Sequence, residues 1–294
     1  MEFDDVRAFV AVASSGSISL AARDLNVTQS AVTRRLQRLE ASLGTSLLDR
    51  GTRPVRLTGV GQATLERCRR LLNDVREVRA AASNGGPLKG EFRVGVAHAL
   101  TESTLTEPVG EIRRKFPNLA LRLSTGWSRE VLERVRSGAL DAAVILLGDG
   151  ESLPVGVTGK QIAKERLVVV APRRYSPRRI RKIQDLSKVQ WILNPEGCAA
   201  RAGLRRALLQ ADIDMIVAVE TYNYELQLAL VAQNRGLTLV PEGILSRSRQ
   251  RSRLRILRVA GLDFPLVVWL VCHEPLAGCE PVVAELVRAL AQRL

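Results

Sequence analysis

Residues 28–40, with the sequence TQSAVTRRLQRLE, decide the fold of the N-terminal part of this chain. Val32, Leu36 and Leu39 recur at spacings of four and three residues, which places them on one face of a helix, and Leu43 extends that face. Thr28 is a good N-cap residue. The pattern therefore predicts a helix with one side packed on a small domain and a polar side available to a partner.

Two shorter helices are expected before this one. The first has apolar residues at i, i+3, i+4 and i+7 over residues 6–13, and Gly16 ends it. Ser17 can cap the second, whose small pair Ala21-Ala22 permits a close helix crossing. The short turn Asn26-Val27 then leads into residues 28–40. Three helices joined in this way predict a helix-turn-helix, which places its last helix in the major groove of DNA.

The polar side of the third helix carries side chains suited to reading bases. Gln pairs bidentately with adenine and Arg with guanine. A merely solvated face is the alternative interpretation. Two short apolar segments around Gly51-Thr52-Arg53 predict a β-hairpin wing, whose arginines would lie along phosphates. The candidate DNA contacts are Thr28, Gln29, Ser30, Thr33, Arg34, Gln37, Arg38, Arg50, Arg53 and Arg56.

A long helix is predicted from about Val60 to Ala82, before the helix-breaking residues 83–87. Leu65, Cys68, Leu72 and Val75 follow a 3-4-3 spacing, and Leu71 and Val78 widen the stripe. This pattern suits pairing with a second copy of the helix. A two-fold dimer would place two recognition helices in successive major grooves. The alternative is that this stripe packs on its own domain.

From residue 90 onward, short apolar strands alternate with helical patterns. Strands are predicted at residues 92–96, 119–123, 142–147, 167–170, 191–193, 216–219, 237–240 and 266–272. Helices are predicted up to residue 115 and over residues 128–137, 199–210 and 222–234. The alternation predicts parallel sheets covered by helices, and the number of strands favours two α/β lobes.

A ligand site is expected where strands end, because helix N-termini present free N–H groups there. Such a site favours an anionic or polar effector, often a carboxylate, and Trp127 and Tyr222 can stack on an aromatic ring. Capping or loop packing is the alternative for each residue, and a structural role for His98 has at least equal weight. The candidate effector contacts are His98, Ala99, Leu100, Thr101, Thr125, Gly126, Trp127, Ser128, Asn194, Gly197, Thr221 and Tyr222.

The net charge of +14 suggests a polyanionic partner, nucleic acid first. The excess is not concentrated in the helix-turn-helix, because the densest basic run is Arg247 to Arg258. We interpret that run as a solvated loop and strand edge, with contact to DNA or another anion as the alternative. No apolar run approaches the roughly 18 residues that span a bilayer, and the acidic N-terminus lacks a secretion pattern. We therefore expect a cytoplasmic protein with no membrane partner.

Catalytic and metal motifs are not found in the sequence. Four cysteines form no C-x-x-C pair, and with two histidines a zinc cluster is not expected, so the thiols are interpreted as free and reduced. There is no glycine-rich phosphate loop and no G-x-S-x-G elbow. We expect no enzyme, no metal and no cofactor. The remaining alternative is a solute-binding protein without a DNA function.

The N-terminal motifs resemble the DNA-binding domain of LysR-type transcriptional regulators. The match covers GSISLAARDL at residues 16–25, residues 28–40, Leu43 to Arg50, and LTGVG at residues 57–61. Leu48 stands where the family usually has Phe, and Ser30 where Pro is common. Neither departure removes a polar contact, so the ordered match predicts a DNA-binding regulator.

The resemblance also implies the organisation of the rest of the chain. It implies a winged helix-turn-helix over residues 1–59, a linker and dimerisation helix over 60–86, and an effector domain over 87–294. That domain is expected to have two periplasmic-binding-protein-like α/β lobes, at about 90–162 with 267–294 and at about 163–266, joined near residues 161–165 and 263–265. The family implies a homodimer that associates into a homotetramer on double-stranded DNA. Peroxide-sensing relatives carry a reactive cysteine near Cys198, but no second cysteine follows until Cys272.

Overall fold

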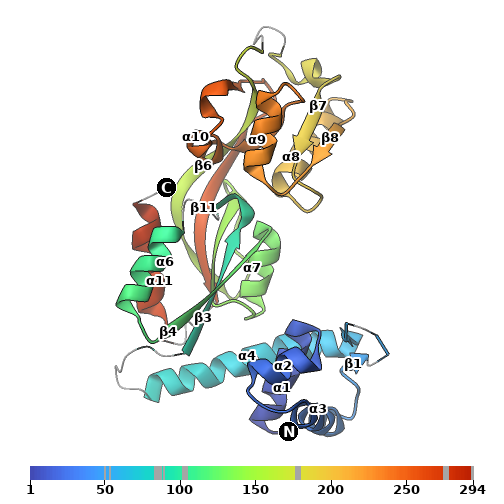
Figure 1. Ribbon diagram of the computed structural model, residues 1–294, viewed down its shortest axis with the longest axis vertical. Helices are drawn as coiled ribbons and strands as arrows, with labels where there is room; N and C mark the ends of the chain where they lie inside the picture. Colours follow the sequence, from blue (N-terminus) through green and yellow to red (C-terminus); the bar gives the residue numbers. More distant parts are fainter. Residues whose placement is uncertain are drawn as a thin grey trace. The chain divides into compact units, whose positions relative to one another are not determined.

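The computed structural model describes residues 1–49, 51–52, 54–82, 88, 90–100, 105–175, 180–273 and 278–292. The chain divides into two compact units, one built mainly from Met1–Gly86 and the other mainly from Pro87 onward. Each unit has its own core, and Figure 1 labels their elements. No helix in these described ranges is long and apolar enough to cross a bilayer.

The first unit is a winged helix-turn-helix. Helices α1 (Phe3–Ser15), α2 (Ile18–Asp24) and α3 (Gln29–Leu43) precede the strands β1 (Leu48–Asp49) and β2 (Arg56–Leu57), which pair antiparallel, and the long helix α4 (Gly59–Ala82) follows. The expected end signals are confirmed. Gly16 ends α1 with a φ of 64°, and the hydroxyls of Ser17 and Thr28 accept from the backbone N–H groups of Leu20 and Ala31.

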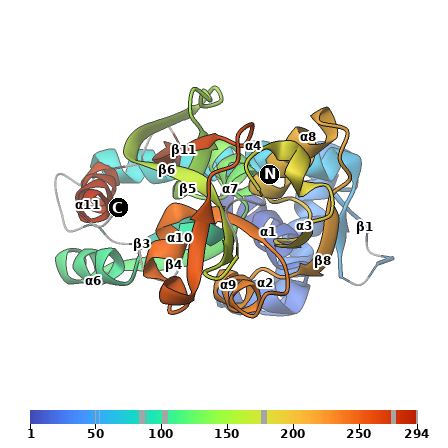
Figure 2. The same cartoon turned by 90° about the horizontal axis from the view of Figure 1, so that it is seen from above.

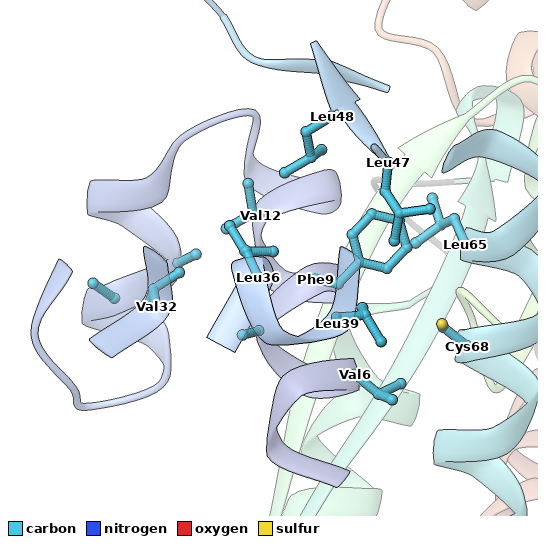
Figure 3. Packing of buried hydrophobic residues seen from close by; sticks show 13 residues of the cluster. Val6, Phe9, Val12, Val32, Leu36, Leu39, Leu47, Leu48, Leu65 and Cys68 are labelled. Atoms are coloured by element: carbon cyan, nitrogen blue, oxygen red, sulfur yellow. The ribbon is translucent and has the colours of Figure 1, made fainter. Parts of the chain in front are cut away.

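The core of this unit lies between α1, α3 and the start of α4 (Figure 3). Phe9, Val32 and Leu39 are fully buried in it, as the periodicity predicts. Leu43 is not part of the core. It is 43% exposed because it is the last residue of α3, where the helix has passed beyond the other elements.

The linker helix uses its apolar stripe differently from the prediction. Leu65 and Cys68 are buried in the core of their own unit, and Leu72 packs against it. These three residues therefore take the alternative role of packing on their own unit, where α1 contacts α4, and pairing of the helix with a second copy stays a prediction. Leu71 and Val78, at the edge of the stripe, are 39% and 70% exposed.

The second unit is built on a mixed sheet of seven strands in the order β10-β6-β11-β5-β3-β4, with β9 also paired to β6. The strands are β3 (Gly90–Ala97), β4 (Leu119–Gly126), β5 (Ala142–Gly148), β6 (Val157–Pro172), β9 (Thr238–Pro241), β10 (Leu254–Leu257) and β11 (Phe264–His273). Among the described residues, β3 pairs parallel with β4 and with β5, and the other pairs of this sheet are antiparallel. The alternation predicts parallel sheets, but this sheet is mixed, because β6 and β11 pair antiparallel with each other and with their neighbours.

The two crossing segments are parts of continuous strands rather than loops. Residues 161–165 lie inside the sixteen-residue strand β6, and residues 264–265 begin β11. These two strands run side by side through both lobes (Figures 1 and 2). The first half of β6 pairs with β11 in lobe one, and its second half pairs with β9 and β10 in lobe two, so backbone hydrogen bonds along one strand tie the lobes together.

Helices cover the sheet in both lobes. Lobe one has η1 (His98–Leu100), α6 (Thr106–Lys115), α7 (Ser128–Arg136) and α11 (Glu280–Ala291). Lobe two has η3 (Ile183–Leu186), the parallel pair β7 (Gln190–Leu193) and β8 (Ile216–Glu220), α8 (Ala199–Gln210), α9 (Tyr224–Ala232), α10 (Glu242–Arg247) and η4 (Arg251–Arg253). The helix α11 is absent from the expected elements. It is held to α6 by Glu285, whose pKa is lowered to about 2 by hydrogen bonds from Arg288 and Lys115.

Candidate DNA-reading face and effector cavity

One side of α3 is open to solvent as the sequence predicts. Gln29, Ser30, Arg34 and Gln37 are exposed, while Val32, Leu36 and Leu39 on the opposite side are buried. Among the described residues, the Arg34 guanidinium makes no hydrogen bond or ion pair. A free guanidinium beside exposed amides can approach base edges without breaking contacts within the protein.

Three other candidates on α3 already serve the fold. The Thr28 hydroxyl caps the helix, and the Thr33 hydroxyl donates to the Gln29 carbonyl at 2.9 Å. Arg38 donates through Nε and Nη2 to Oδ1 of Asp5, at 3.2 and 2.6 Å. Burial raises the pKa of Asp5, but the hydrogen bond from Arg38 and other contacts lower it further, so the shift is downward. Arg38 thus binds α3 to α1.

The wing offers one described candidate. Arg56 is exposed on β2, opposite Asp49 on β1. Arg50 and Arg53 lie outside the described residues.

A cavity of about 740 Å³ lies between the two lobes of the second unit. On one side it reaches the carboxyl ends of the parallel strands β3, β4 and β5, where ligands bind in open α/β sheets. On the other side it is lined by the first turns and one face of α8. Tyr224, Pro241 and Phe264 contribute apolar surface.

Five of the twelve effector candidates line this cavity: His98, Ala99, Trp127, Ser128 and Gly197. The Ser128 hydroxyl is engaged, because it accepts from the Leu146 backbone N–H at 3.1 Å. Six candidates are not among the lining residues: Leu100, Thr125, Gly126, Asn194, Thr221 and Tyr222. Asn194 instead joins the ends of β7 and β8 by donating to the Thr221 carbonyl at 3.2 Å. Thr101 lies outside the described residues.

Three aromatic rings, two of which line the cavity, meet across the lobes. His98 and Trp127 follow β3 and β4 in lobe one, and Tyr222 follows β8 in lobe two. The Tyr222 ring stacks on Trp127 with ring centroids 5.7 Å apart and lies 5.6 Å from His98. Gly197 approaches Trp127 so closely that an added Cβ would lie 2.9 Å from the indole ring. Tyr222 therefore acts through Trp127 rather than as a cavity wall.

The charged groups of the cavity include residues outside the candidate set. Arg129 and Arg206 are its arginines, and Asp149, Glu151 and Asp263 are its carboxylates. Arg129 lies 3.5 Å from Glu151, whereas Arg206 makes no contact of this kind with described residues. Asp149 follows β5, so the search at strand ends that found the other candidates could also have found it. Arg206 lies on the second turn of α8, and no sequence motif there predicts that it lines a cavity.

Cys198 lies at the start of α8 and lines the cavity, but it is only 5% exposed. Burial raises the pKa of its thiol, which outweighs the nearby N–H groups and Arg201. The thiol is therefore protonated at neutral pH, which does not favour a peroxide-reactive thiolate.

Arg201 anchors α8, one face of which lines the cavity, to lobe two. Its guanidinium is 9% exposed and donates to the Asn194 carbonyl at 3.1 Å and to Glu220 at 2.7 Å. A third contact, with Glu196, is 3.1 Å long. One side chain thus joins α8 to the ends of both β7 and β8.

These features define a DNA-binding transcriptional regulator with an effector-binding domain. Sequence profiles match "Bacterial regulatory helix-turn-helix protein, lysR family" over residues 3–62 and "LysR substrate binding domain" over residues 85–294. The chain belongs to the LysR family of regulators, which is not a family of enzymes.

Curated relatives cover most of the chain. It is 28% identical to the HTH-type transcriptional regulator IlvY of Escherichia coli over 291 residues, 94% of this chain and 96% of the relative. It is also 28% identical to the HTH-type transcriptional regulator GltR of Bacillus subtilis over 255 residues, 87% and 84% of the two chains.

Solved structures show the same fold at low sequence identity. Full-length OxyR from Pseudomonas aeruginosa matches with a TM-score of 0.77 at 20% identity, covering 99% of this chain and 94% of that one. CbnR in complex with its target DNA matches with a TM-score of 0.58 at 24% identity, covering both chains completely.

Proposed function

We propose that this regulator reads its operator through Gln29, Ser30, Arg34 and Gln37, as a homodimer that forms a homotetramer, in the cytoplasm where the DNA is. The exposed polar side of α3, backed by buried leucines, is the observation that carries this proposal. Leu71 and Val78 lie seven residues apart on the exposed side of α4 and support pairing of the linker helices over residues 60–86. Sedimentation of the full chain tests the assembly: a monomer at micromolar concentration would contradict it.

We further propose that the effector has an apolar or aromatic body and an acidic group, bound in the 740 Å³ cavity. The apolar part of the effector would pack against apolar and aromatic lining residues of the cavity, namely Trp127, Tyr224, Phe264 and Leu266. Arg206, which has no carboxylate partner among the described residues, suits the acidic group. An effector that prefers one arrangement of the lobes shifts that equilibrium and with it the placement of the recognition helices.

Substitution of Arg34 tests the DNA proposal. Arg34→Ala is expected to cost about 1–3 kcal/mol on a duplex selected by the wild-type protein from a random library, and less on random duplex. Arg34→Lys keeps the charge but loses the forked guanidinium, so it should also weaken selected DNA more than random DNA. Fluorescence anisotropy with both duplexes measures the difference. Equal losses on the two duplexes would show that Arg34 contacts only phosphate.

The sign of the effector's charge is tested with benzoate, benzylamine and benzyl alcohol, which share one ring. Benzoate should raise the melting temperature of the full chain the most. Arg206→Gln should weaken benzoate binding by about ten- to a hundredfold, since a hydrogen bond to a charged group is worth about 1.5–3 kcal/mol.

Arg205→Gln is the matched control, because Arg205 is the neighbouring residue on α8 but pairs with Glu196 outside the cavity lining. Stronger stabilisation by benzylamine would instead assign the site to the carboxylates Asp149, Glu151 and Asp263, and would contradict an acidic effector.

A further inference from the structure

Two distant segments of lobe two carry most of the protein's excess positive charge. Residues 173–182 and 246–258 each contain six arginines or lysines and no acidic residue. Residues 1–86, by comparison, hold thirteen arginines against nine carboxylates, so they supply only a small part of the net charge of +14. The charge that a DNA-binding protein normally concentrates on its DNA-binding domain lies elsewhere in this chain.

The fold brings these two segments together. β10 pairs with the end of β6, where Leu254 lies opposite Pro172, and the Arg173 N–H donates to the Arg253 carbonyl at 2.8 Å. A second link joins Lys182 to Ala260. We call this surface the basic edge; its described cations are Arg173, Arg174, Arg181, Lys182, Arg247, Arg249, Arg251, Arg253, Arg255 and Arg258.

In the described part of the protein, the ten cations of the basic edge greatly outnumber the carboxylates near them, Asp185 and Glu242, which lie within electrostatic range of Lys182, Arg251 and Arg258. None of these cations forms a side-chain ion pair there, and the hydrogen bonds of their side chains go to neutral oxygens, as from Arg173 to the Ser252 carbonyl. The nearby carboxylates are engaged. Asp185 accepts the backbone N–H groups of Arg181 and Lys182, and Glu242 pairs with Arg166 at 2.5 Å.

The basic edge also lacks the apolar anchors of a protein-binding surface. Protein interfaces gain most of their energy from buried aromatic and apolar side chains. The exposed large hydrophobic residues of the described chain lie elsewhere, for example Leu209, Ile216 and Leu226 in lobe two. A dense row of arginines without such anchors fits a chain of phosphates.

We propose that the basic edge of lobe two binds the phosphate backbone of duplex DNA, as a second, sequence-independent contact beyond the recognition helices. DNA is the polyanion that this protein already binds through its first unit, so a second segment of the same duplex is present at high local concentration. Such contacts add affinity that falls steeply with salt, because each neutralised phosphate releases counterions.

The test uses the full chain and an 80-base-pair duplex of random sequence. Arg249→Glu with Arg251→Glu reverses two exposed cations that have no described ion-pair partner. The slope of log affinity against log salt should then fall in magnitude by about 2, since each phosphate contact contributes about 0.9. Arg249→Gln with Arg251→Gln should lower the slope by a similar amount without adding repulsion. Tryptophan fluorescence checks that both variants are folded.

The control is Arg113→Glu with Arg114→Glu on α6 of lobe one, which changes the net charge equally at two exposed positions. It should leave the slope unchanged. An unchanged slope in the basic-edge variants, or an equal fall in the control, would overturn the proposal. Loss of activation by RNA polymerase with unchanged DNA affinity would also overturn it and assign the edge to an acidic protein. The preference for selected over random duplex depends on α3 and should survive in all these variants.

Discussion

Replacing Gly61 with alanine is expected to unfold the first unit and abolish DNA binding while the second unit stays folded. A Cβ at position 61 would lie 2.0 Å from the Leu47 carbonyl oxygen and 2.9 Å from its carbon. These are backbone atoms, so no side chain can rotate away. The start of α4 must then separate from the segment that leads into the wing, at a cost of about 3 kcal/mol or more.

Gly59→Ala is the matched control for this substitution. Gly59 begins the same helix, and an added Cβ there meets no atom within 4 Å. Alanine at this position should be neutral or stabilise by up to about 1 kcal/mol, because it restricts the unfolded chain. Equal effects of the two substitutions would show that the close contact at Leu47 does not limit the fold.

The positions of the tryptophans make the two units separately measurable. All three tryptophans and all three tyrosines lie beyond residue 86, so intrinsic fluorescence reports on the second unit alone. In Gly61→Ala, circular dichroism should show less helix already at low temperature, and the duplex should not bind at micromolar protein. The fluorescence transition should match that of the wild type. A shifted fluorescence transition would contradict independent folding of the second unit.

The helix-turn-helix could be predicted in detail because its signals are local. Gly16, Ser17 and Thr28 mark helix ends through contacts with residues three or four positions away, so the sequence alone contains both partners. The outward side of α3 follows from the spacing of Val32, Leu36 and Leu39 for the same reason.

Periodicity identified the apolar stripe of α4 but not the surface that covers it. Leu65 and Cys68 have the spacing of a coiled coil, and that spacing also suits packing on a single neighbouring helix. Which of the two partners covers the stripe depends on the position of α1 in the folded unit. Leu43 illustrates the same limit, since its position on the apolar face of α3 does not say how far the neighbouring elements extend.

The crossing strands and much of the cavity depend on contacts between residues far apart in the sequence. The first half of β6, with the sequence VTGKQIAK, contains two lysines, a glutamine and a glycine and lacks an apolar alternation, so it resembles a connection. It becomes a strand because β11, about a hundred residues later, pairs with it. Arg206 faces the cavity only because α8 packs at that angle, whereas Asp149 could have been found from the end of β5.

Removal of the Arg201 guanidinium is expected to destabilise lobe two by about 2–4 kcal/mol. Arg201→Ala leaves the Asn194 carbonyl and Glu220 without the donor that joins them. The cost is below that of a fully buried ion pair, because Glu220 and Glu196 are 47% and 60% exposed and water can reach them. α8 would then be held to the ends of β7 and β8 mainly by its apolar side.

Arg205→Ala on the same helix provides the control. Arg205 pairs with the same Glu196 at 3.2 Å, but its side chain is 55% exposed. An exposed pair of this kind contributes only about 0.2–1 kcal/mol. Urea unfolding followed by tryptophan fluorescence measures both variants, because Trp191 is fully buried in the core that Leu204 and Leu208 of α8 complete. Since α8 also lines the cavity, Arg201→Ala should weaken benzoate binding while Arg205→Ala leaves it unchanged. Equal shifts in the two urea midpoints would show that burial of Arg201 adds nothing to the anchoring of α8.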